Sequence, residues 1–109
     1  MRESNVIVEY IRYQIPAAEQ TAFEEAYIAA EGPLRTSPHC LGWELARCAE
    51  DPTQYVLRIE WDSAEGHLQG FRTSPEFRDF FTAVRPFVDN IQEMRHYEVT
   101  TVHGTKGDG

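Results

Sequence analysis

Three side chains in this sequence could move a proton or hold a planar aromatic molecule: Glu9, Trp61 and His67. His67 lies between two glycines, and an imidazole that titrates near neutral pH could accept the proton of a phenol. Glu9 is the only carboxylate on the strand face that it shares with three isoleucines, where burial would raise its pKa and make it an alternative base. Trp61 ends a strand, so its ring could stack on a planar substrate while its N–H donates to a substrate oxygen. We expect these three as the catalytic residues.

Each of the three also has a purely structural interpretation. His67 could be a surface histidine on a short helix, and Glu9 could lie on a solvated face or pair with an arginine. Trp61 could be a core residue that caps the hydrophobic layer. The sequence leaves both interpretations open for each residue.

Aromatic residues are the expected wall of a substrate pocket. The candidates are Tyr13, Tyr55, Phe71, Phe77, Phe80 and Phe81. An aromatic stripe at helical spacing and a buried tyrosine with a bonded hydroxyl are also common features of a plain core. His96 and Tyr97 are neighbours on a strand and point to opposite faces, so at most one of them can reach a given pocket.

The elements that position these residues follow from hydrophobic periodicity. Alternating β-branched and aromatic residues predict strands at 6–15, 40–48, 54–61 and 91–102. Helical spacing predicts a helix over 17–31 that ends at Gly32-Pro33. A second, interrupted helix starts at Asp62 or Ser63 and restarts at Ser74-Pro75.

The element order β-α-β-β-α-β is that of a ferredoxin-like α+β fold with an antiparallel sheet. Helices would cover one face of this sheet, and the sheet of a second copy is the usual cover for the other. Arg58 and Glu60 would point towards that second sheet, opposite the apolar face of their strand. A monomer with a solvated sheet face would explain the same pattern.

Composition excludes several classes of function. With 109 residues we expect one domain, over 1–103, and a disordered polar tail, over 104–109. A net charge of −8 with no basic stretch gives no reason to bind nucleic acid or an anionic membrane surface. The absence of a long apolar run, a signal core and a CxxC motif indicates a cytoplasmic protein. No glycine-rich phosphate loop points to a nucleotide cofactor, and no ligand spacing points to a metal.

Two segments resemble the antibiotic biosynthesis monooxygenase family. Residues 59–77 (IEWDSAEGHLQGFRTSPEF) resemble its strand-ending tryptophan, short helix, Ser/Thr-Pro step and aromatic second helix, and residues 40–45 (CLGWEL) resemble its second strand. The resemblance implies a homodimeric α+β barrel with a pocket between helices and sheet in each protomer. It further implies oxidation of phenols or hydroquinones by O2 without metal or flavin, although other members degrade haem and shared fold does not settle function.

The chain departs from the family pattern at several positions. Phe81 aligns with the iron-binding histidine of the haem-degrading members, and Glu9 with their first-strand asparagine, which removes the reason to expect haem turnover. Leu57 stands where phenol-oxidising members have an asparagine, so the resemblance adds Leu57 to the expected pocket. Phe71 stands at a position that is often histidine, and His67 lies one helical turn earlier.

The expected function is therefore a cofactor-independent monooxygenase that oxidises a small phenolic or quinol-like aromatic with O2 and needs no metal. Three alternatives remain: a non-catalytic module that binds a small molecule in the same pocket, a haem-binding protein, and an accessory dimer with no pocket ligand.

Overall fold

Four segments of alternating apolar and polar residues form one antiparallel sheet. The computed structural model describes residues 6–107 and places these strands at β1 (Ile7–Gln14), β2 (Cys40–Arg47), β3 (Gln54–Trp61) and β4 (Ile91–Glu98). Their order across the sheet is β2-β3-β1-β4, and every neighbouring pair is antiparallel. The chain therefore has the predicted ferredoxin-like α+β fold.

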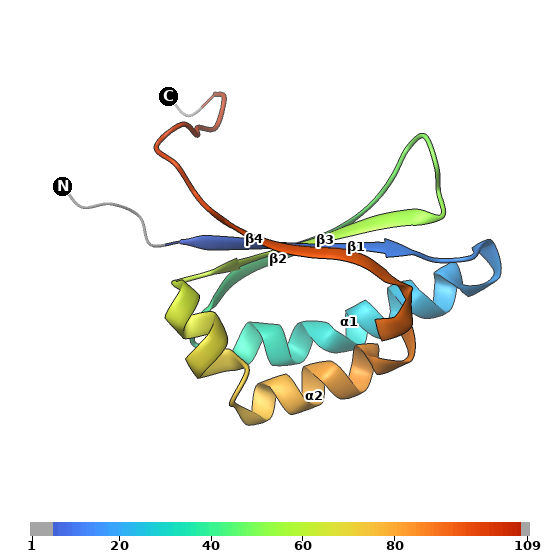
Figure 1. The fold of residues 1–109 in the computed structure, drawn as a ribbon, viewed down its shortest axis with the longest axis horizontal. Coiled ribbons are helices and arrows are strands. Elements are labelled where there is room, and N and C mark those ends of the chain that lie inside the picture. The colour runs from blue at the N-terminus through green and yellow to red at the C-terminus, as the bar shows by residue number, and fades with distance from the viewer. Residues whose placement is uncertain (1–5, 108–109) are drawn as a thin grey trace.

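The helices all lie on one face of the sheet (Figure 1). The helical elements are η1 (Ala17–Glu19), α1 (Gln20–Thr36), η2 (Gly66–Phe71), α2 (Pro75–Val84) and η3 (Arg85–Asn90). Within residues 6–107, no helix lies on the opposite face of the sheet. No helix in that part is both long enough and apolar enough to cross a membrane.

The prediction that Gly32-Pro33 ends the first helix was wrong, because α1 continues through Pro33 to Thr36. Gly32 has no Cβ to clash with the proline ring that follows it, which removes part of the usual penalty for a helical residue before proline. The extra turn buries the Leu34 side chain. It is closed by the Ser37 backbone N–H, which donates to the Pro33 carbonyl at 3.2 Å.

The last strand was predicted too long, since β4 ends at Glu98 rather than at Val102. The ladder between β1 and β4 ends at the pair Ile7–Glu98, and one further backbone hydrogen bond joins the Val99 N–H to the Val6 carbonyl at 3.2 Å. Val102 is accordingly exposed. Residues 104–107 contain only a turn, and the rest of the predicted tail lies outside the described residues.

The core lies between the sheet and the helices. The helix-facing side chains of β3 are buried as predicted: Tyr55, Leu57, Ile59 and Trp61. Arg58 and Glu60 lie on the helix-free face, where they form an ion pair with each other at 2.6 Å.

Two glycines allow the irregular segment that follows β3. A Cβ on Gly66 would collide with the Asp62 carboxylate, and one on Gly70 would collide with the His39 ring. Only glycine lets η2 approach these side chains so closely. The segment is a π-helix, with the Arg72 N–H donating to the His67 carbonyl at 3.0 Å. After it, Ser74 caps α2 as predicted, since its side chain accepts from the Phe77 N–H.

Candidate functional site

Four residues from separate elements meet on the helix-facing side of the sheet, at the end where β3 finishes. Glu9 lies near the start of β1, directly opposite His96 of β4 in the antiparallel ladder. Trp61 is the last residue of β3, and His67 projects inward from η2. Because Glu9 and His96 sit on paired strands, their backbones are held rigidly.

Glu9 is a buried carboxylate with one hydrogen bond. Its side chain is 4% exposed, and its Oε1 accepts from Trp61 Nε1 at 3.0 Å. His67 Nε2 lies 3.6 Å from the same oxygen, and His96 Nε2 lies 3.5 Å from Oε2. Burial raises the pKa of Glu9, and the Trp61 hydrogen bond and the charges of His96 and Arg72 only partly oppose this. The alternative interpretation, in which Glu9 is solvated or pairs with an arginine, is therefore wrong.

His67 is also buried, which rules out the surface interpretation of this residue. Its side chain is 3% exposed, and its ring stacks on Trp61 with centroids 4.5 Å apart. Neither ring nitrogen has a hydrogen-bond partner among the residues that the structure describes. Burial, aided by the charges of Arg72 and His96, lowers the pKa of His67 to about 4. The imidazole is thus neutral at physiological pH.

A cavity of about 210 Å³ opens in front of Glu9 and His67. The predicted pocket residues Tyr13, Phe71, Phe77, Phe80 and Phe81 line it. Its other lining residues are Ile11, Tyr27, Ile59, Arg72, Val84, Val88, Ile91 and Met94. Apart from Glu9, His67, Arg72 and two tyrosines, this wall is apolar, so a bound molecule would meet few polar groups.

The two tyrosines of the cavity bond to each other. The hydroxyls of Tyr13 and Tyr27 lie 2.5 Å apart. Burial raises the pKa of Tyr13 to about 12, so this hydroxyl keeps its proton at physiological pH. The pair can offer a hydrogen bond to a ligand oxygen without becoming charged.

Trp61 is fully buried and does not line the cavity. Its ring backs His67, and its N–H is committed to Glu9. In this arrangement Trp61 is a positioning residue for the other two rather than a surface on which a substrate stacks.

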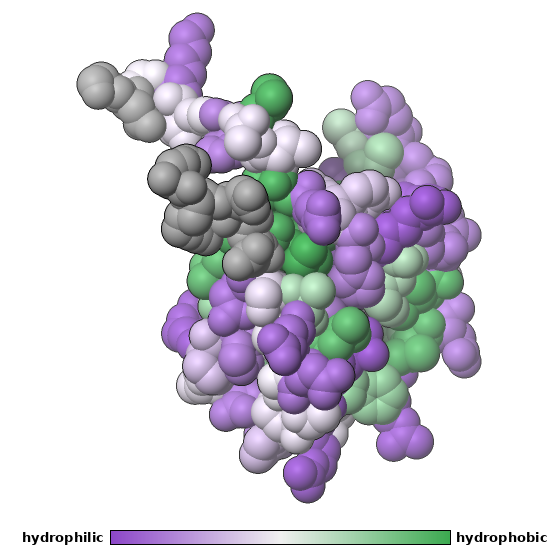
Figure 2. Space-filling view, turned by 60° about the vertical axis from the view of Figure 1, so that its left-hand side comes forward, coloured by the Kyte–Doolittle hydropathy of each residue, from purple (hydrophilic) through white to green (hydrophobic). Residues whose placement is uncertain are grey.

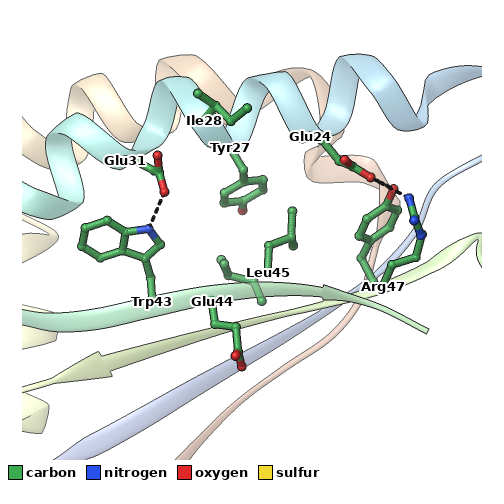
Figure 3. A pocket seen from close by; sticks show the side chains of 10 residues that line it. Glu24, Tyr27, Ile28, Glu31, Trp43, Glu44, Leu45 and Arg47 are labelled. Atoms are coloured by element: carbon green, nitrogen blue, oxygen red, sulfur yellow. Dashed lines mark hydrogen bonds and ion pairs between the residues drawn. The ribbon is translucent and has the colours of Figure 1, made fainter. Parts of the chain in front are cut away.

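The fold does not bring Tyr55 and Leu57 into this cavity. They line a separate open pocket of about 450 Å³ between α1 and β2. Figure 3 shows this pocket, with Tyr27 and Leu45 between the two elements and Glu44 on the opposite face of β2. At one end Glu31 accepts from Trp43 Nε1, and at the other Glu24 holds Arg47 (Figure 3). A role for Tyr55 and Leu57 in substrate binding stays a prediction.

Sequence reasoning missed three polar residues of the site: Tyr27, Arg72 and His96. His96 was recognised only as facing away from Tyr97, and the ladder confirms this, since His96 pairs with Glu9 and Tyr97 with Val8. The signal that could have identified His96 is the register of β1 with β4, which the sequence does not give. For the same reason, spacing rules did not reveal that Glu9, His67 and His96 have potential ligand atoms within 4.8 Å of one another.

Chemically, the arrangement is a buried proton acceptor beside an apolar chamber. A carboxylate with a raised pKa and a neutral imidazole lie 3.6 Å apart at one wall, and mostly apolar side chains, many of them aromatic, line the rest. Such a site suits proton abstraction from a small apolar molecule.

Known proteins share this fold. A crystal structure from Bordetella bronchiseptica, assigned as an antibiotic biosynthesis monooxygenase, matches with a TM-score of 0.76 at 24% identity, covering 88% of this chain and 98% of that one. The structure of SnoaB, a cofactor-independent oxygenase from Streptomyces nogalater, matches with a TM-score of 0.68 at 17% identity, covering 95% and 99% of the two chains. At these identities the structural matches establish the fold alone.

Sequence comparison establishes the family. The protein YczJ of Bacillus subtilis (strain 168) is 26% identical over 76 residues, which is 70% of this chain and 80% of YczJ. The family model for antibiotic biosynthesis monooxygenases matches residues 6–83. The chain therefore belongs to the antibiotic biosynthesis monooxygenase family.

Proposed function

We propose that the protein is a cofactor-independent monooxygenase that oxidises a small phenolic or quinol-like aromatic with O2. The observation that carries the proposal is the apolar cavity whose wall holds the buried Glu9–His67 pair. Family membership and the likeness to SnoaB, a cofactor-independent oxygenase, support it.

The first step is removal of the phenol proton. The hydroxyl of a substrate in the cavity lies against Glu9 and His67, and one of the two accepts its proton. The raised pKa of Glu9 makes it a stronger base than an ordinary carboxylate, and His67 is a neutral acceptor beside it. The guanidinium of Arg72, which lines the same cavity, favours the phenolate that forms.

The phenolate then reacts with O2 through its own electron density. A carbon–oxygen bond forms at the ring, the O–O bond breaks, and water leaves with the two hydrogens that the substrate loses. A phenol and one O2 thus give a quinone and one water, so atoms and electrons balance without a further reductant. The protein contributes the base, an apolar chamber and a hydrogen bond from the Tyr13–Tyr27 pair.

We further propose that the protein acts as a homodimer joined through the helix-free sheet face. That face exposes Tyr10 and Tyr97, whose rings contact each other with centroids 5.5 Å apart. Figure 2 views the molecule from the side and shows hydrophobic side chains exposed among hydrophilic ones, both at the level of the sheet and below it. Packing against the sheet of a second copy would remove these rings from water.

Oxygen uptake tests the proposed activity. Metal-free protein, prepared with EDTA, is screened with phenols and hydroquinones of one to three rings, and quinone formation is followed by absorbance. We expect uptake with at least one of them, and a loss of roughly a hundredfold or more in Glu9→Gln or His67→Ala, as is typical when a general base is removed. The control His103→Ala alters an exposed histidine outside the sheet. Tight binding without oxygen uptake would support the non-catalytic binding module instead.

A further inference from the structure

Three potential metal ligands from three different elements surround one point beside the cavity. They are Glu9 of β1, His67 of η2 and His96 of β4, and one donor atom from each lies within 4.8 Å of the others. Two histidines and one carboxylate are a recurrent ligand set for divalent transition metals, with coordination positions left open.

The spacing of the donor atoms fits an ion better than it fits hydrogen bonds. The distances from Glu9 to His67 Nε2 and to His96 Nε2 are 3.6 and 3.5 Å, both too long for a good hydrogen bond. Around a tetrahedral ion with bonds of about 2.1 Å, neighbouring ligand atoms lie about 3.4 Å apart. One donor atom from each of the three residues lies within 4.8 Å of the others, so the side chains would close in on an ion to reach bonding distance.

The state of His67 is a second, independent observation. This imidazole is buried, yet neither of its nitrogens has a hydrogen-bond partner among the described residues. Buried polar atoms almost always have a partner. An ion bound between His67 and Glu9 would supply one for Nε2.

The surroundings both support and limit such a site. Trp61 Nε1 donates to Glu9 Oε1, as outer-shell donors to ligating carboxylates commonly do. The His96 side chain is 38% exposed, which gives an ion a route from solvent. The positive charge of Arg72 acts on both Glu9 and His67, so it weakens cation binding relative to a closed structural zinc site.

We propose that Glu9, His67 and His96 form a binding site for one divalent transition metal ion, such as Zn²⁺, whose remaining coordination positions face solvent and the cavity. The inference goes beyond the proposed function. The ion would occupy the atoms that accept the phenol proton, so bound Zn²⁺ would inhibit oxygen uptake by the metal-free protein.

Titration of the untagged full-length chain tests the site. EDTA-treated protein is titrated with Zn²⁺ by calorimetry, and with Co²⁺ by visible absorption, which reports four- or five-coordinate geometry through its intensity. We expect one ion per chain and a Co²⁺ spectrum with at least one nitrogen ligand. His96→Ala should weaken Zn²⁺ binding roughly tenfold or more, as should Glu9→Gln.

Matched controls separate this site from incidental binding. His39 forms a partly exposed pair with Asp62 at 3.1 Å, and His103 is exposed, so His39→Ala and His103→Ala test the other histidines of the described chain. Zn²⁺ affinity that is lost in His39→Ala and retained in His96→Ala would overturn the assignment, as would the absence of saturable binding in the folded parent protein. Circular dichroism of each variant establishes folding, and His96→Gln replaces any variant that fails to fold. Because oxygen uptake is measured in EDTA, failure of the metal site leaves the proposed activity to its own test.

Discussion

The burial of His67 predicts a pH-dependent contribution to stability that a single substitution should remove. The folded protein holds this imidazole at a pKa of about 4, against 6.5 in the unfolded chain. Between these values the unfolded state binds a proton that the folded state does not. Stability conferred by the neutral ring is therefore complete above about pH 6.5 and is lost as the pH falls towards about 4.

The magnitude follows from linkage. On lowering the pH from about 8 to about 5.5, one group with these two pKa values costs the folded state about 1.4 kcal/mol. His67→Gln keeps a polar side chain and removes the titration. We expect the free energy of unfolding of this variant, relative to the parent protein, to rise by about 1.4 kcal/mol over the same interval. The interval stays above the sequence pI of about 4.9, where solubility is lowest.

The effect is measured by urea unfolding in EDTA at the two pH values. One protein concentration is used throughout, because the stability of a dimer depends on protein concentration. The groups that face His67 are Glu9 of β1, His96 of β4 and Arg72 after η2, and they remain in both proteins. His103→Gln, which alters an exposed ring, should follow the parent protein. A stability difference between His67→Gln and the parent that does not change with pH would mean that the ring titrates alike in folded and unfolded chains, contrary to this prediction.

Three further predictions test other parts of the structure. Burial raises the pKa of Glu9, so the folded state is destabilised as the pH rises through that pKa. Glu9→Gln should therefore stabilise the protein at about pH 8 and lose this gain towards about pH 4.5. A gain in stability that grows on acidification, measured by urea unfolding, would contradict this. Tyr27→Phe should lower the free energy of unfolding by about 1–3 kcal/mol, because it leaves the buried Tyr13 hydroxyl without its partner. The double variant with Tyr13→Phe should lose less stability than the sum of the two single variants. Additive losses in thermal or urea unfolding would mean that the two hydroxyls are not coupled. Tyr97→Asp on the helix-free face should raise the dissociation constant of the proposed dimer roughly tenfold or more in sedimentation experiments. Ile28→Asp, at an exposed position of α1, should leave it unchanged. Equal behaviour of the two variants would place the dimer contact elsewhere.

The fold was predictable because local patterns and the sheet agree. Alternation in 54–61 assigned Tyr55 and Trp61 to the buried face, and Ser74-Pro75 marked the start of α2. The predicted helix end at Gly32-Pro33 was wrong because burial of Leu34 outweighs the local tendency of proline to end a helix. The end of β4 was predicted wrongly because the length of this strand depends on its pairing with β1, which begins at Ile7.

The site was only partly predictable, because its members meet through tertiary structure. Glu9 could be chosen as a lone carboxylate on an apolar strand face, since that choice needs only the period of a strand. The inward direction of His67 depends on a π-helical turn that packs against His39, and the position of His96 depends on the register between β1 and β4. Tyr55 and Leu57 share the buried face of β3 with Ile59, yet only Ile59 reaches the cavity, because the other two lie under the pocket next to β2.

The proposed oxygenase activity is tested by oxygen consumption of the metal-free protein. With a phenol or hydroquinone that fits the cavity, we expect one O2 to be consumed per quinone formed, with activity lost in Glu9→Gln, in His67→Ala or in both, and kept in His103→Ala. Equal activity in all four proteins would contradict the assignment of Glu9 and His67, and the absence of uptake with every bound phenol would contradict the oxygenase itself.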